Sequence, residues 1–205
     1  MKIFLLASFI TSLVCAGGVA QAEWSANAGF ASEYYYRGIL QESSSANGGL
    51  DFESGGFYAG TWAADVGDGL EVDGYFGYGT DVGDISLSVG FTGYYYTGDF
   101  DDTYQEINLG AGFGVFTFDV AVGQYENFDG PTQDYTYYSV TAEKNGFYGK
   151  IGGFSQDFEG EYLEAGYGTT VADIDLGVSL IFSNSDLVGE SDEAIIFTLG
   201  KSFDL

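Results

Sequence analysis

The pattern that decides the fold is clearest in residues 116–123, which read Phe-Thr-Phe-Asp-Val-Ala-Val-Gly. Apolar side chains occupy the even positions, and small or polar side chains occupy the odd ones. A period of two places these two sets on opposite faces of a β-strand. In a helix, Asp119 and Val122 would share one face and no coherent apolar stripe would form. The stretch therefore predicts a strand with one apolar and one polar face.

The same alternation recurs along the chain, for example in residues 85–92, 106–111 and 174–180. It predicts twelve strands, at 24–36, 44–53, 57–66, 70–79, 85–97, 103–112, 116–126, 134–144, 147–157, 161–170, 174–183 and 192–203. An even number of strands is typical of single-chain bacterial outer-membrane barrels. Each strand with its turn takes about 15 residues, which suits a tilted membrane strand.

The links between these strands alternate in length. Tight turns are expected at 54–56, 81–84, 112–115, 145–146 and 171–173, and longer polar links at 37–43, 98–102, 127–133, 158–160 and 184–191. The link near 67–69 is short where a long one is expected, so the alternation is imperfect. Outer-membrane barrels have short periplasmic turns and longer external loops. Because the first link is long, both termini are expected in the periplasm.

A soluble sandwich or lipocalin-like barrel would also alternate, but with its apolar face inside. Here the polar face carries few Lys and Arg residues, and twelve strands enclose more space than side chains readily fill. Aromatic clusters near the strand ends suit the interfacial girdles of a membrane barrel: Trp24, 34–36, 94–96 and 135–138. The last eight residues, 198–205, resemble the terminal-strand signal of barrel assembly. We therefore predict an all-β, antiparallel, up-and-down transmembrane β-barrel.

The first 22 residues read as a secretory signal peptide. Lys2 precedes an apolar run at 3–14, and Ala20-Gln21-Ala22 is a small-residue cleavage site. A membrane anchor and lipoprotein processing at Cys15 are the alternatives. The predicted domains are a signal peptide at 1–22 and a barrel at 23–205, exported through the inner membrane to the outer membrane of a Gram-negative bacterium.

Composition narrows the function classes. The formal net charge is −26, and after residue 22 the basic residues are only Arg37, Lys144, Lys150 and Lys201. Such a chain repels nucleic acid and attracts cations. Residues 23–205 contain no His and no Cys, which removes the usual nucleophiles, bases and soft metal ligands. We expect no enzyme activity, no cofactor and no bound metal.

Residues 32–39, Ser-Glu-Tyr-Tyr-Tyr-Arg-Gly-Ile, are followed by Gln41 and by related motifs at 49–51 and 56–63. These segments resemble the TorF-type family of porins of the proteobacterial outer membrane. Leu40 and Glu42 depart from the family pattern. The resemblance implies an outer-membrane barrel and a channel. Partners are then outer-membrane lipid, the barrel assembly machinery, and small solutes or cations.

If apolar positions face lipid, charged residues on the opposite face line the lumen. This predicted pore lining comprises Glu33, Arg37, Asp51, Glu71, Asp73, Glu106, Asp119, Glu143, Lys150, Glu164 and Asp175. Rings of carboxylates favour cations, so a porin-like channel for small polar or cationic solutes is expected. Arg37 is expected to pair with Glu33, and Lys150 with an acid on a neighbouring strand. The alternative is a closed structural or ion-binding barrel without conduction, with residues 98–102 as a weak Ca²⁺ candidate.

Overall fold

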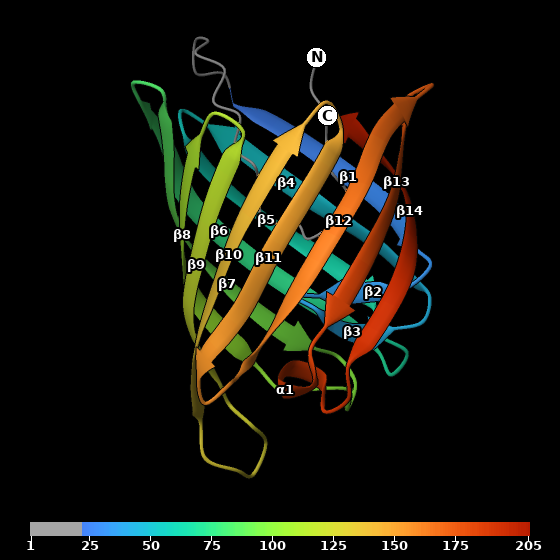
Figure 1. Ribbon diagram of the computed structural model, residues 1–205. Helices are drawn as coiled ribbons and strands as arrows, with labels where there is room; N and C mark the ends of the chain where they lie inside the picture. The colour runs from blue at the N-terminus through green and yellow to red at the C-terminus, as the bar shows by residue number, and fades with distance from the viewer. Residues whose placement is uncertain (1–21) are drawn as a thin grey trace.

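The computed structural model describes residues 22–205 (Figure 1). The predicted signal peptide lies outside this range except for Ala22. Within it the chain forms a closed barrel of twelve antiparallel strands, which pair in chain order and close between the first and the last strand. The barrel strands are β1 (Glu23–Ala31), β4 (Ser45–Ser54), β5 (Phe57–Asp65), β6 (Leu70–Val82), β7 (Ile85–Tyr96), β8 (Tyr104–Phe113), β9 (Phe116–Tyr125), β10 (Gln133–Lys144), β11 (Phe147–Gln156), β12 (Gly160–Val171), β13 (Ile174–Ser183) and β14 (Asp192–Asp204). The predicted fold class is confirmed.

The period-two pattern sorts side chains between the outside and the inside of the barrel. On β9, Phe118, Val120 and Val122 are 48%, 37% and 52% exposed, whereas Ala121 between them is 2% exposed. The same contrast runs around the barrel, where exposed Leu, Ile, Val and Phe side chains cover the outer surface. An apolar outer band with a polar interior is the arrangement of an outer-membrane barrel, and it is opposite to that of a soluble one.

The two ends of the barrel differ, as the link lengths predicted. Both termini of the barrel lie at the end with the tight turns (Figure 1). The turn between β10 and β11 has Asn145 and Gly146 at φ 55° and 83°, the left-handed pair that a two-residue hairpin requires. The longer links gather at the opposite end, together with the short helix α1 (Ser185–Val188). No helix in residues 22–205 is long and apolar enough to cross a membrane.

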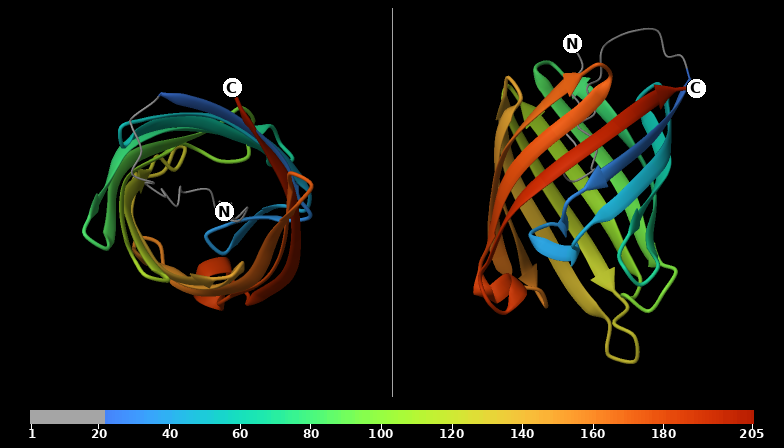
Figure 2. Two further views of the ribbon diagram at one scale, coloured as in Figure 1. Left: turned by 90° about the horizontal axis from the view of Figure 1, so that it is seen from above. Right: turned by 90° about the vertical axis from the view of Figure 1, so that its right-hand side faces the viewer.

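The first long link departs from the prediction. The predicted strand at 24–36 ends at Ala31, and the predicted link at 37–43 contains part of a second, separate sheet. There β2 (Tyr34–Tyr36) and β3 (Ile39–Glu42) form a hairpin, with Arg37 and Gly38 at its tip at φ 50° and 87°. Viewed along the barrel axis, this hairpin projects into the lumen (Figure 2). We call residues 34–42 the lumen hairpin.

Candidate functional site

The tip of the lumen hairpin is fixed to the barrel wall by an ion pair. Arg37 donates from Nη1 and Nη2 to the two carboxylate oxygens of Glu106 on β8, at 2.8 and 2.7 Å. The two side chains are 3% and 0% exposed, and this is the only ion pair in residues 22–205. A buried charge is tolerated when it is paired and hydrogen-bonded, and the two-pronged Arg–carboxylate geometry is the strongest form of such a pair.

Tyrosines complete the surroundings of this pair. Glu106 also accepts hydrogen bonds from Tyr94 at 2.8 Å and Tyr135 at 2.9 Å, so its carboxylate has four donors. The guanidinium carbon of Arg37 lies 4.1 Å from the ring centre of Tyr137 and 4.8 Å from that of Tyr36. Both distances are within the range of cation–π attraction. The cation is therefore held by a carboxylate and by two aromatic faces.

Further contacts hold the sides of the hairpin. Tyr34 donates to Glu71 at 2.7 Å, Tyr35 to Asp192 at 2.6 Å and Tyr36 to Tyr94 at 2.6 Å. Burial raises the pKa of the Tyr34 phenol, and the nearby carboxylates of Glu71 and Asp73 raise it further, so the hydroxyl stays protonated and can donate. The hairpin is thus attached to β6, β7, β8 and β14.

Gly38 is required at the tip for two reasons. Its φ of 87° is left-handed, and a Cβ there would lie 2.7 Å from Cγ of Tyr162 and 2.8 Å from Leu187. Its carbonyl oxygen accepts a hydrogen bond from Ser183 Oγ at 2.5 Å. A side chain at this position would therefore be strained and would also collide with the wall, which means that the tip is closely packed against β12 and β13.

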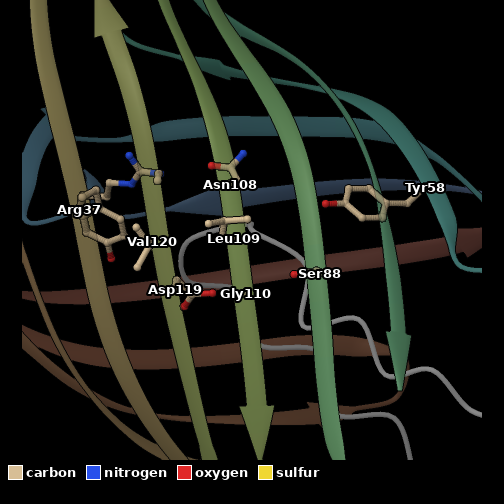
Figure 3. A pocket seen from close by; sticks show the side chains of 10 residues that line it. Arg37, Tyr58, Ser88, Asn108, Leu109, Gly110, Asp119 and Val120 are labelled. Atoms are coloured by element: carbon tan, nitrogen blue, oxygen red, sulfur yellow. The ribbon is translucent and has the colours of Figure 1, made fainter. Parts of the chain in front are cut away.

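Beside the hairpin lies a small cavity of about 30 Å³ with a mixed polar and apolar lining (Figure 3). Arg37 and Tyr137 border it, together with Tyr58, Ser88, Asn108 and Asp119. Asn108 donates to Thr92 at 2.8 Å, and Asp119 accepts from Ser139 at 3.2 Å. The space next to the hairpin is therefore of the size that holds water, and hydrogen-bonding groups form part of its lining.

The structure gathers only some of the predicted pore-lining residues. Arg37, Glu71, Asp73 and Glu106 meet at the lumen hairpin, and Asp119 borders the cavity. The others are distributed along the barrel. Three of them are carboxylates that accept hydrogen bonds: Asp51 from Asn27 and Tyr75, Glu164 from Tyr148, and Asp175 from Thr170. Of the remaining three, Glu33 lies just before β2, Lys150 lies on β11, and Glu143 lies near the tight-turn end of β10.

Both predicted ion pairs are wrong, because neither forms in residues 22–205. Arg37 binds Glu106 and not Glu33, because the chain leaves the barrel wall after Ala31 and carries Arg37 across the lumen. Lys150 lies opposite Glu164 in the β11–β12 register but forms no ion pair. Its ammonium is 6.0 Å from the ring centre of Tyr137, on the same ring that Arg37 covers.

The tyrosine clusters are mostly not interfacial girdles. Tyr94, Tyr135 and Tyr137 are 4%, 2% and 3% exposed and point into the barrel. Their neighbours Tyr95 and Tyr138 face outwards, at 47% and 39%. Strand parity in the sequence contains this signal, since Tyr135 and Tyr137 fall on the same face as Ser139. The inward tyrosines are the functional candidates that the girdle interpretation missed.

Five inward tyrosines lie across glycines of an adjacent strand. In each case the tyrosine and the glycine are direct partners in the register: Tyr58 with Gly77, Tyr75 with Gly60, Tyr135 with Gly123, Tyr148 with Gly166 and Tyr162 with Gly152. A Cβ on any of these glycines would lie between 2.3 and 2.6 Å from the tyrosine side chain. The glycines therefore make room for rings to lie against the inner wall.

The sequence was compared with models of known protein families and with curated protein sequences. A family model described as "Bacterial protein of unknown function (Gcw_chp)" matches residues 15–203. No curated protein sequence matches significantly.

Solved structures resemble the chain at low sequence identity. A chain from a study of the in-meso crystallisation of membrane proteins aligns with a TM-score of 0.58 and 9% identity, covering 89% of this chain and 84% of that one. OccK2 (OpdF) of Pseudomonas aeruginosa, solved in complex with glucuronate, gives a TM-score of 0.43 and 11% identity over 85% of this chain. This chain covers 61% of the OccK2 chain and 61% of the outer-membrane protein OpdK from the same organism, where the TM-score is 0.41 and the identity 14%.

Proposed function

Because the chain belongs to the Gcw_chp family of bacterial proteins of unknown function, we propose its function from the barrel itself: a porin-like outer-membrane channel for small polar or cationic solutes. The observation that carries the proposal is a closed barrel with an apolar outer band whose polar lumen is narrowed by an inserted hairpin. The resemblance of residues 32–41 to the TorF-type family agrees with it, and most of the lumen hairpin lies in this segment.

The charge of the lumen supports a preference for cations. Three carboxylates, Glu71, Asp73 and Glu106, surround the hairpin tip, and the cations beside them are Arg37 and Lys150, whose ammonium lies 6.0 Å from the ring of Tyr137. Once the hairpin leaves the lumen and water enters, such an excess of carboxylates concentrates cations and repels anions. The proposal includes export through the inner membrane with cleavage of the signal peptide after Ala22, and insertion by the barrel assembly machinery, with outer-membrane lipid around the apolar band. It involves no catalytic step and no cofactor.

A second candidate function is a closed structural or ligand-binding barrel. It is favoured by the burial of Arg37 and Glu106, because a pair with almost no exposure blocks part of the lumen in this conformation. The two candidates differ in whether the hairpin leaves the lumen.

Single-channel conductance in planar bilayers tests the proposal, using the barrel purified from outer membranes. We compare the wild type with a variant in which residues 34–42 are replaced by a short Gly-Ser linker. Steady steps that are larger in the variant, with a reversal potential of cation selectivity in a KCl gradient, are expected. Asp73→Asn should lower the selectivity, and the exposed loop variant Asp129→Asn is the matched control. A folded but silent linker variant would reject the channel in favour of the closed barrel.

A further inference from the structure

The barrel wall carries a seat for a guanidinium group that does not depend on the hairpin backbone. Glu106 on β8 supplies the carboxylate, and Tyr94 on β7 and Tyr135 on β10 orient it by hydrogen bonds. Tyr137 on β10 supplies an aromatic face. Only Tyr36, the second aromatic face, belongs to the lumen hairpin. We call Glu106, Tyr94, Tyr135 and Tyr137 the guanidinium seat.

We propose that the guanidinium seat binds guanidinium-bearing solutes, and that Arg37 occupies it as a tethered competitor. This deepens the proposed channel function by naming a solute class. When a solute takes the seat, the ion pair that fixes the hairpin tip is lost, and the hairpin is then free to leave the lumen. Solute binding and channel opening are thereby coupled.

The chemistry of the seat selects guanidinium over ammonium. The two oxygens of Glu106 bind the two terminal nitrogens of Arg37 at 2.8 and 2.7 Å, a fork that a planar guanidinium fits and a single ammonium nitrogen does not. The aromatic face lies 4.1 Å from the guanidinium carbon, and a flat cation can stack there. Lys150 illustrates the difference, because its ammonium lies 6.0 Å from that same ring and makes no ion pair within the described residues.

A second acceptor lies beside the seat. Asp73 is opposite Tyr94 in the β6–β7 register and is 9% exposed. Its Oδ1 is buried and has no hydrogen-bond partner within the described part of the chain. An unsatisfied buried carboxylate oxygen is costly, and a donor on a bound solute would satisfy it. The seat thus suits solutes that carry a guanidinium and a second donor group.

The external end of the barrel supports the approach of such cations. The links around that end carry carboxylates, including Asp99, Asp129 and Glu190, whereas Lys144 lies at a tight turn of the opposite end. Negative loops at the mouth raise the local concentration of cationic solutes before they reach the seat.

Ligand-dependent unfolding of the Arg37→Ala barrel tests the proposal without any need for conduction. Heat-modified gel mobility gives the unfolding temperature in the presence of methylguanidinium or methylammonium chloride. Methylguanidinium should raise the unfolding temperature at about tenfold lower concentration than methylammonium, since it makes one more charge-assisted hydrogen bond. Adding Glu106→Gln to Arg37→Ala should abolish the shift. The wild type and Lys144→Ala, whose seats are occupied, should respond much less.

An equal response to both cations, an unchanged unfolding temperature, or a shift that survives Glu106→Gln would overturn the proposal. If Arg37→Ala fails to fold, the same titration is made with the variant in which a linker replaces residues 34–42. That variant retains the guanidinium seat and lacks Arg37. Conductance separates the two claims. A conducting barrel that does not bind methylguanidinium rejects this inference alone, and a barrel that binds it but never conducts rejects the channel.

Discussion

Replacing Glu106 by Gln should release the lumen hairpin while leaving the barrel closed. Gln is similar in size but carries no charge, and its amide nitrogen is a donor facing the four donors that Glu106 now satisfies. Arg37 would be left as a buried, unpaired cation. Breaking a buried ion pair by removing one partner costs about 3–5 kcal/mol. The two side chains are 3% and 0% exposed, so solvent screening does not reduce this figure.

The strands themselves lose no backbone hydrogen bond, so the hairpin is the part that responds. At about 1.4 kcal/mol for each factor of ten, even 3 kcal/mol raises the released population of the hairpin about a hundredfold. This holds while the released form remains the minor one, a local opening of the kind that proteolysis detects.

Trypsin measures this population directly. Cleavage after Arg37 requires the hairpin tip to leave the lumen, and it yields a short N-terminal fragment that mass spectrometry identifies. We expect the rate of cleavage at Arg37 to rise about a hundredfold in Glu106→Gln. Glu164→Gln is the matched control, because Glu164 is also a buried carboxylate with a tyrosine partner but does not contact the hairpin. Equal rates of cleavage at Arg37 in the wild type and in Glu106→Gln would refute the conclusion that the Arg37–Glu106 ion pair holds the hairpin in the lumen.

Three further predictions concern the same interior. Gly38→Ala should release the hairpin as well, because φ 87° and the contact with the wall both disfavour a side chain, and trypsin cleavage at Arg37 measures it. Gly77→Val should displace the ring of Tyr58 and lower the unfolding temperature seen by gel mobility, whereas Gly74→Val on the open side of the same strand should not. The raised pKa of Tyr34 makes hairpin docking fully favourable below about pH 10, the ordinary tyrosine value, and progressively weaker as the pH rises towards the raised pKa. Conductance should therefore rise only as the pH is raised above about 10, and a flat profile there would contradict the role of that hydroxyl.

The barrel was predictable because the sequence signals for its strands and turns involve residues that are close together in the chain. Alternation in stretches such as 116–123 determines which side chains face outwards, and Asn145-Gly146 specifies a two-residue turn without reference to the rest of the chain. The long and short links then distinguish its two ends. Each of these signals depends on neighbours a few residues apart.

The lumen hairpin was not predictable in the same way. Residues 34–36 are three consecutive tyrosines, which continue a strand as well as they begin a hairpin, so β1 was expected to extend to 36. The partner of Arg37 is 69 residues away along the chain, and no periodicity relates the two positions. By contrast, the inward direction of Tyr94 and Tyr135 was available from strand parity, but aromatic residues near strand ends also suit a girdle.

The position of the lumen hairpin in the chain has a consequence for biogenesis. The hairpin lies between β1 and β4, so it is synthesised before each of the wall strands that hold it. Its anchor points on β6, β8, β13 and β14 become available only as the sheet grows, and Asp192 is provided by the final strand. Complete docking of the hairpin therefore coincides with closure of the ring. A protease-resistant hairpin would then distinguish a finished barrel from an unclosed sheet during insertion.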